Sequence, residues 1–298
     1  MSSMDVPWHR IAAMRKLLVM TIVLVATAAA GPAQVAEGDQ HWAARAEGHQ
    51  SGRAKATHID AAIAAYQRAV AQNPNDLEAR WKLLRALRFK GAYVASTSDE
   101  KKQVYTTAKK AGEDTLALLD RLLAAKGLRS VTKATEKDVA DAAKSIPGAD
   151  EVFFWDSVNW GEWALVYGKM AAVREGAAGR IRREATIAML MDPKLEGGGP
   201  PRVLGRLHDQ TPRVPFITGW ASSREALRFL NESLKIDPSN KITRVFLAEA
   251  MVSDNSDTKP QAIQSLRELL TTPNDPAYEV EQAAAQDDAR ALLKKWGA

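Results

Sequence analysis

Cysteine is absent from the 298 residues of this chain. The chain therefore has no disulfide bond to form, no thiol nucleophile, and no cysteine on which a lipoprotein could be acylated. A protein without disulfides depends on a sizeable hydrophobic core, and this composition, 46% hydrophobic and 26% charged, is that of a globular protein.

The chain also lacks a strong excess of either charge. Lysine and arginine number 41 against 36 acidic residues, and the net charge of +5 is spread along the sequence without long blocks. A uniform surplus of this size is weak evidence for a nucleic-acid partner, and we predict none. β-branched residues are sparse and rarely alternate, whereas alanine, leucine and arginine dominate, which favours helices over strands.

Long hydrophobic runs are missing except near the N-terminus, where basic residues precede the apolar run Leu17 to Ala30. Small residues follow as far as Ala36, which completes the three parts of a secretory signal. The run has 14 residues, fewer than the roughly 20 needed to cross a bilayer. We predict a signal peptide over residues 1–36, cleaved after Ala30, Ala33 or Ala36, and a periplasmic protein; an uncleaved anchor is the alternative.

Four segments have apolar residues at helical spacing and end at a proline. Proline cannot continue a helix and disfavours helical geometry in the residue before it. Helices are therefore predicted over residues 59–72, 181–191, 224–236 and 261–270, ending before Pro74, Pro193, Pro238 and Pro273.

Helix starts are marked as well. Ser222 with Glu225, and Thr258 with Gln261, have the spacing of a capping box, in which side chains bind the free amides of a first turn. Thr135 is predicted to cap the helix that follows it in a looser version of the same pattern.

The four prolines are separated by 119, 45 and 35 residues, and the shorter spacings approach the tetratricopeptide period of roughly 34. Ala62, Tyr66 and Ala69 before Pro74 have the small, large and small pattern that lets neighbouring helices pack closely. We predict an all-α fold in which tetratricopeptide-like (TPR-like) helical hairpins form a compact solenoid or bundle of about a dozen helices. Residues 37–298 are expected to form this single domain.

Aromatic residues are few overall but concentrate in one predicted helix, between residues 153 and 167. Trp160, Trp163 and Tyr167 share one stripe, whereas Trp155 points in another direction. The stripe either fills the core between hairpins or, with Asn159 as a polar partner, lines a ligand or partner cleft. Replacing Trp160 or Trp163 by alanine would distinguish the two interpretations. Loss of a core side chain impairs folding, whereas loss of a cleft side chain leaves the protein folded but impairs ligand binding.

Two connecting segments contain proline and glycine. In Arg213–Trp220, Pro215 would interrupt a strand ladder, so we expect an ordered loop. Its residues Phe216, Gly219 and Trp220 are candidates for a binding surface, with a simple connection as the alternative. Gly197–Pro201 lacks the spacing of a phosphate-binding loop and is predicted to be a flexible linker.

Catalytic groups are not recognisable. The five histidines lack the spacing of a zinc site, and no serine stands in a nucleophile elbow. His208 beside Asp209 could act as a base in principle, but no nucleophile accompanies it. We therefore predict no catalytic residues, no metal and no cofactor.

The order of elements from Ala149 to Pro273 resembles a specific family. An aromatic helix is followed by a helix ending at Met191-Asp192-Pro193, a Gly-Pro segment, the loop before Gly219, and a helix ending at Asp237-Pro238. This order is similar to the T component (TatT-like) of tetratricopeptide-associated TRAP transporters. The resemblance implies a TPR-like fold, a periplasmic substrate-binding protein as partner, a homo-oligomer such as a trimer, and a cleft for a small ligand. The missing cysteine departs from the many members that look like lipoproteins.

The sequence thus predicts a non-catalytic periplasmic helical-repeat component of TRAP-type solute uptake. A general TPR scaffold for protein–protein interactions in the bacterial envelope is the alternative.

Overall fold

The computed structural model describes residues 31–128 and 130–298, and within them the chain is helical without a named strand. The all-α prediction is therefore confirmed for this part. The basic and apolar regions of the predicted signal peptide lie outside the described residues. Residues 31–36, which the same prediction assigns to the signal, begin a helix over residues 31–43.

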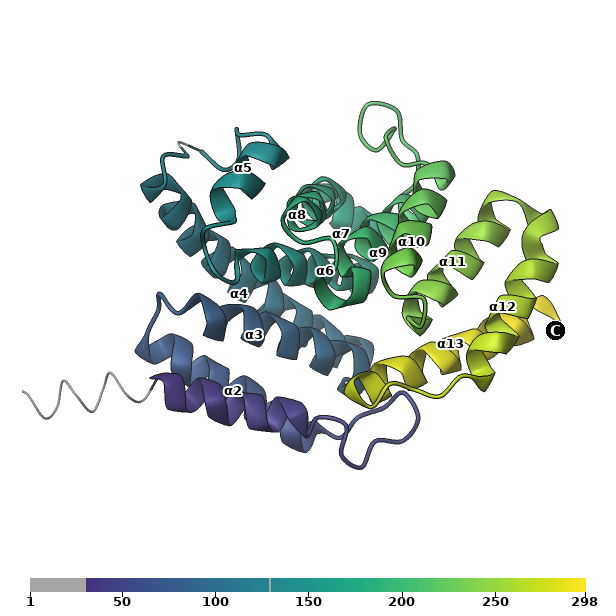
Figure 1. Cartoon of the computed structure of the whole chain (residues 1–298), viewed down its shortest axis with the longest axis horizontal. Coiled ribbons are helices and arrows are strands. Elements are labelled where there is room, and N and C mark those ends of the chain that lie inside the picture. Colours follow the sequence, from purple (N-terminus) through teal and green to yellow (C-terminus); the bar gives the residue numbers. More distant parts are fainter. Residues whose placement is uncertain (1–30, 129) are drawn as a thin grey trace, which may run out of the picture.

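After that first helix the elements follow in a simple order (Figure 1). They are α2 (Ala56–Gln72), α3 (Leu77–Phe89), η1 (Lys90–Val94), α4 (Ser98–Ala125), α5 (Glu136–Ala143), α6 (Ala149–Tyr167), α7 (Lys169–Arg174), α8 (Ala177–Met191), α9 (Leu195–Gln210), α10 (Ser223–Ile236), α11 (Lys241–Asp254), η2 (Ser256–Thr258), α12 (Lys259–Thr271), η3 (Pro276–Tyr278) and α13 (Glu279–Trp296).

The predicted ends of four helices agree with the structure. Helices α2, α8 and α10 each end two residues before a proline, at Gln72, Met191 and Ile236. Helix α12 ends at Thr271, also two residues before its proline. The residue between helix and proline is extended in every case, as the steric restriction before proline requires.

Two of the three predicted helix starts agree with the structure. The Ser222 hydroxyl accepts a hydrogen bond from the Glu225 amide at 3.4 Å, and Thr135 accepts one from Asp138 at 3.2 Å. The Thr258 prediction was wrong, since its hydroxyl donates to the Asn255 carbonyl at 2.7 Å instead of capping α12. A short 3₁₀ turn occupies the chain before α12, so Thr258 is already helical and cannot act as a cap.

The helices pack as successive antiparallel pairs. The first members are the helix over residues 31–43, α3, α6, α9 and α11, and the second members are α2, α4, α8, α10 and α12. Each second helix contacts the first helix of the next pair, and from α3 onward each first helix contacts the next first helix. Helix α13 follows the last pair and packs on α11 and α12. Helix α5 packs mainly on α8, outside this series.

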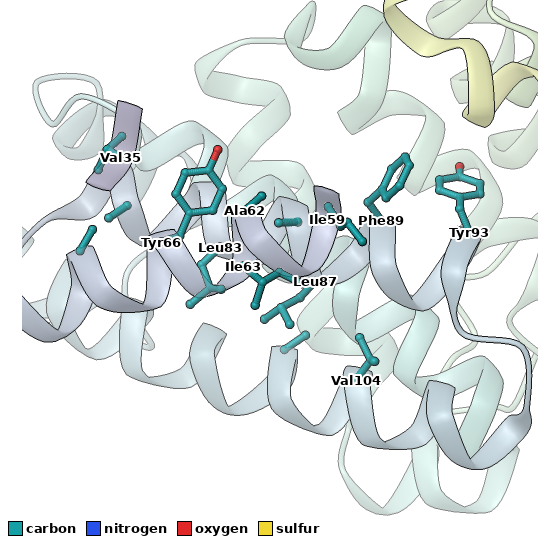
Figure 2. Close-up of a cluster of buried hydrophobic side chains, with 14 of the residues drawn as sticks. Val35, Ile59, Ala62, Ile63, Tyr66, Leu83, Leu87, Phe89, Tyr93 and Val104 are labelled. Carbon is teal, nitrogen blue, oxygen red and sulfur yellow. The ribbon is translucent and has the colours of Figure 1, made fainter. Parts of the chain in front are cut away.

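The first core cluster joins the helix over residues 31–43 to α2, α3 and α4 (Figure 2). Tyr66 of α2 is fully buried in it, and its hydroxyl donates to Asp39 at 2.8 Å. Val35 belongs to the same cluster, so the first helix is part of the packed core rather than an appendage.

The two ends of the series contact each other. The Arg45 guanidinium forms an ion pair with Glu281 of α13 at 2.9 Å. The Ser51 hydroxyl donates to Asp287 at 2.7 Å, and Gly52 packs so closely on Ala284 that a Cβ would overlap its backbone. The segment after the first helix therefore closes the chain of helices onto its C-terminal helix.

A buried ionic group joins α4, α6 and α8. Asp156 is fully buried, and its carboxylate accepts a hydrogen bond from Arg180 at 3.0 Å. Arg180 also binds Glu184 at 3.0 Å. Burial and the neighbouring Asp156 carboxyl raise the pKa of Glu184 well above its ordinary value of 4.5. Gly112 of α4 lies directly against the Asp156 carboxylate.

Gly112→Ala is expected to lower the free energy of unfolding by about 1–3 kcal/mol, because the added Cβ would overlap a carboxylate oxygen that cannot move. Gly161→Ala, at an open helical position on α6, is the matched control and should raise it by about 0.5–1 kcal/mol. Urea titrations of both variants measure the difference. Equal stabilities would show that α4 and α6 do not approach this closely.

Glu184→Gln is expected to make stability less dependent on pH. The folded protein binds the Glu184 proton more tightly than the unfolded chain does. Its stabilisation is therefore present below pH 4.5 and is lost as the pH rises through the raised pKa. The loss is up to about 1.4 kcal/mol per pH unit. Glutamine has nearly the same size and keeps an oxygen that accepts from Arg180, but it has no titrating proton.

Urea titrations over a series of pH values test this prediction. Glu232→Gln, on the exposed face of α10, should retain the slope of the parent chain. A Glu184→Gln slope equal to that of the parent would contradict a raised pKa of Glu184.

Candidate functional site

The aromatic stripe predicted on residues 153–167 exists on α6. Trp163 lies 5.6 Å from Trp160 and stacks on Tyr167 at 4.6 Å between ring centroids. Trp160 and Trp163 are buried in a cluster with Tyr105 and Ile181, so the stripe packs between α4 and α8. Tyr167 is more exposed, and its hydroxyl pairs with Thr106 at 2.7 Å.

Trp155 faces another direction, as its position in the helix predicts. It packs against Phe154 at 4.8 Å in a separate core cluster, and its indole N–H donates to Glu151 at 2.9 Å. Asn159 is completely buried, and its side-chain amide donates to the Leu84 carbonyl at 3.1 Å. Asn159 therefore ties α6 to α3.

The ordered loop predicted over Arg213–Trp220 is present and projects from the helices beside α10 (Figure 1). The buried Thr218 hydroxyl holds it by accepting from the Val214 amide at 3.0 Å and donating to the Pro212 carbonyl. Phe216 is fully exposed at a φ of +65°, an unfavourable conformation for a bulky residue. Gly219 is exposed as well.

Trp220 at the end of this loop is fixed by its neighbours. Its ring meets His208 edge-on at 5.1 Å, and the Arg182 guanidinium lies over it at 4.7 Å. His208 also accepts a hydrogen bond from the Ser222 amide at 3.3 Å, so it supports the start of α10. The eight predicted site residues thus lie in separate parts of the molecule and do not meet in one cleft.

A cleft of about 350 Å³ lies elsewhere, where the two ends of the series meet. Its walls come from four separate segments, namely the first helix and the residues after it, α3, the start of α9, and η3. Side chains that line it are Trp42, Arg45, Arg85, Glu196 and Tyr278, together with Ala43, Ala46, Pro276 and Ala277.

Arg85 is held against aromatic rings. Its guanidinium lies 4.0 Å from the centroid of Trp42 and 5.0 Å from that of Trp81. Its buried Nε has no hydrogen-bond partner, and no carboxylate in the described chain lies within ion-pair distance of it. Cation–π contact fixes the orientation of a guanidinium without using its N–H groups.

Arg45 differs from Arg85 although it also lies over Trp42, at 4.3 Å. Its charge is neutralised by Glu281 at 2.9 Å, and it donates to the Ala277 carbonyl. Both arginines line the cleft, but Arg45 is neutralised by a carboxylate, whereas Arg85 has no ion-pair partner among the described residues.

The opposite wall is the glycine-proline segment, and the flexible-linker prediction for it was wrong. Glu196, Gly197 and Gly198 form a turn with positive φ angles of 49°, 61° and 77°. Arg202 fixes this turn by donating to the carbonyls of Glu196 at 3.2 Å and Gly197 at 3.4 Å. Helical geometry resumes in α9 after this turn, and Pro200 stands at the start of the resumed helix, where an N–H would have no helical partner. The glycines supply left-handed geometry rather than flexibility.

This turn places the Glu196 side chain at the cleft, where the Tyr278 hydroxyl donates to it at 3.4 Å. Burial and the Glu196 charge raise the pKa of Tyr278 to about 12. Burial together with Glu196 also raises the pKa of the nearby Glu151 to about 7, while Trp155 acts in the opposite direction.

Sequence reasoning missed every member of this cleft. Trp42, Arg85, Glu196 and Tyr278 are widely separated in the chain, and none belongs to a motif. Only the meeting of the chain ends brings them together. The one local signal in the sequence was the spacing of Trp81 and Arg85, which are four residues apart and lie on one face of α3.

The described residues show no group of three or more histidine, cysteine, aspartate or glutamate side chains placed to hold a metal ion. His41 meets His58 at 3.2 Å rather than His49. Across the same residues, none of the helices has both the length and the apolar composition to span a bilayer. No protein-family model matches the chain, and no curated protein shows detectable similarity to it.

Proposed function

We propose that the chain is a non-catalytic, TPR-like binding protein of the periplasm that accompanies the solute receptor of a TRAP-type uptake system. The observation that carries this proposal is the cleft, because its walls come from the first helices of separate hairpins and from both ends of the series. Binding grooves of helical repeats are built in this way from successive units.

The packing scheme supports the TPR-like part of the proposal. Each second helix contacts the next first helix, and several second helices end at a proline. Ala62, Tyr66 and Ala69 are all buried in α2. Their small, large and small pattern is the one by which tetratricopeptide helices pack closely.

The projecting loop supports the proposal that the chain binds a partner protein. Its tip exposes Val214, Phe216 and Ile217, while Thr218 and Trp220 hold its base. An apolar tip on an ordered loop is a usual protein-binding feature. We assign contact with a TRAP substrate-binding protein to this tip, on the resemblance to the TatT-like family.

Export follows from the signal-like leader. Cleavage after Ala36 would remove Val35 from the first core cluster, whereas cleavage after Ala30 or Ala33 would keep it. We therefore favour a cleavage site before Val35, after Ala30 or Ala33. Native mass spectrometry of protein from its envelope would report the mature mass and whether the chain forms a trimer.

Site-specific photo-crosslinking tests whether the partner is a TRAP solute receptor. A benzophenone amino acid in place of Phe216 should give, in the native envelope, an adduct that mass spectrometry identifies as a periplasmic TRAP solute receptor. The same amino acid in place of Lys137, an exposed residue of α5, is the control and should not give that adduct.

Adducts only with unrelated envelope proteins would overturn the TRAP assignment and favour the general scaffold. Failure of the Phe216 position to give any specific adduct would overturn the assignment of the loop. Neither outcome depends on a ligand in the cleft.

A further inference from the structure

We propose that the cleft binds a small organic acid, with its carboxylate held by the guanidinium of Arg85 and its apolar part against Trp42 and Tyr278. This inference names a ligand class for the proposed binding function. It rests on that function in one respect, that the cleft is a binding site.

The first argument is the hydrogen-bonding state of Arg85. A guanidinium has five N–H donors, and in Arg85 the buried Nε has no hydrogen-bond partner, while Tyr66 lies within hydrogen-bonding reach of the group. Buried polar groups normally find partners, and an unpartnered donor of a guanidinium at a cleft is an exception that a ligand would remove. A carboxylate matches its planar fork with two parallel hydrogen bonds.

The second argument is the contrast with other arginines near the cleft. Arg45 is paired with Glu281, Arg88 with Tyr93 and Glu162, and Arg202 with backbone carbonyls. Among the described residues Arg85 and Arg202 form no ion pair, but Arg202 donates to two carbonyls, whereas the buried Nε of Arg85 has no partner. Its contacts with Trp42 and Trp81 orient the group before a ligand arrives.

The third argument selects a monocarboxylate over a more highly charged anion. Glu196 also lines the cleft, where it accepts a hydrogen bond from Tyr278 at 3.4 Å. A second negative charge on the ligand would be repelled there, whereas an apolar group would contact Trp42, Ala277 and Tyr278. The volume of about 350 Å³ is at the lower end of ligand pockets.

Calorimetric titration of the purified full chain tests the site, with phenylacetate as the probe. Saturable binding is expected, and phenylacetamide, which has the same shape without the charge, should bind at least about tenfold more weakly. Arg85→Gln should weaken phenylacetate binding by a similar factor. Arg85→Lys should lose part of the affinity, because an ammonium keeps the charge but not the fork.

Arg182→Gln is the matched control, since Arg182 also lies over an indole ring but outside the cleft. It should leave the affinity for phenylacetate unchanged. Circular dichroism and thermal unfolding show whether each variant is folded.

Three results would overturn the inference: no saturable binding of phenylacetate, equal affinity for phenylacetate and phenylacetamide, or binding that folded Arg85→Gln retains. Preference for inorganic phosphate would overturn the assigned ligand class. The titration needs no partner protein, so its failure is distinguishable from failure of the crosslinking experiment at Phe216.

Discussion

Replacing Trp160 by alanine is expected to lower the free energy of unfolding by about 3–5 kcal/mol. The Trp160 side chain is only 2% exposed and packs with Tyr105, Trp163 and Ile181. Because α4 and α8 cannot both close onto α6, most of the volume of the ring would remain as a cavity. Urea or thermal unfolding followed by far-ultraviolet circular dichroism measures the loss.

Phe216→Ala is the aromatic control for this experiment, since Phe216 is fully exposed. Its stability should remain within about 0.5 kcal/mol of that of the parent chain. If Trp160→Ala remained as stable as this control, the aromatic stripe would not be core. The cleft interpretation of that stripe would then regain support.

Arg180→Met is expected to have an effect of similar size, about 3–5 kcal/mol of lost stability. Methionine is unbranched and apolar but shorter than arginine, and it leaves the Asp156 carboxylate in the core without its cation. The Arg180 contact with the Trp160 ring at 4.5 Å is lost as well. The comparison is again made by urea unfolding at neutral pH.

Arg182→Met, on the same helix, is the control. It should change the free energy of unfolding little, because no carboxylate of the described chain pairs with Arg182. Adding Glu184→Gln to Arg180→Met should restore part of the stability, because it removes a titrating carboxyl beside Asp156. Equal losses for Arg180→Met and Arg182→Met would show that the buried group does not require its cation.

The sequence predicts features of this protein that depend on neighbours in the chain. Proline stops such as Asp237-Pro238 act on the residue before them, and the Trp160–Trp163–Tyr167 stripe follows from helix geometry. The ordered loop before Ser222 was also predictable, because Pro215 excludes a strand. These features require no knowledge of distant contacts.

The features that the sequence could not predict depend on distant contacts. Gly197 and Gly198 looked like a flexible linker, since nothing nearby shows that Arg202 holds their carbonyls. Asn159 looked like a cleft residue because its acceptor, the Leu84 carbonyl, belongs to another helix. The cleft itself exists only because residues 42, 85, 196 and 278 meet in space.

The contact between the chain ends has a consequence for how this protein unfolds. In an open array of repeats, each unit touches only its neighbours, so terminal units can melt separately. Here Arg45 with Glu281, and Ser51 with Asp287, connect residues 236 positions apart. Melting of α13 therefore also removes contacts of the first hairpin. We expect hydrogen exchange to show the two termini opening together, as one cooperative unit that includes the walls of the cleft.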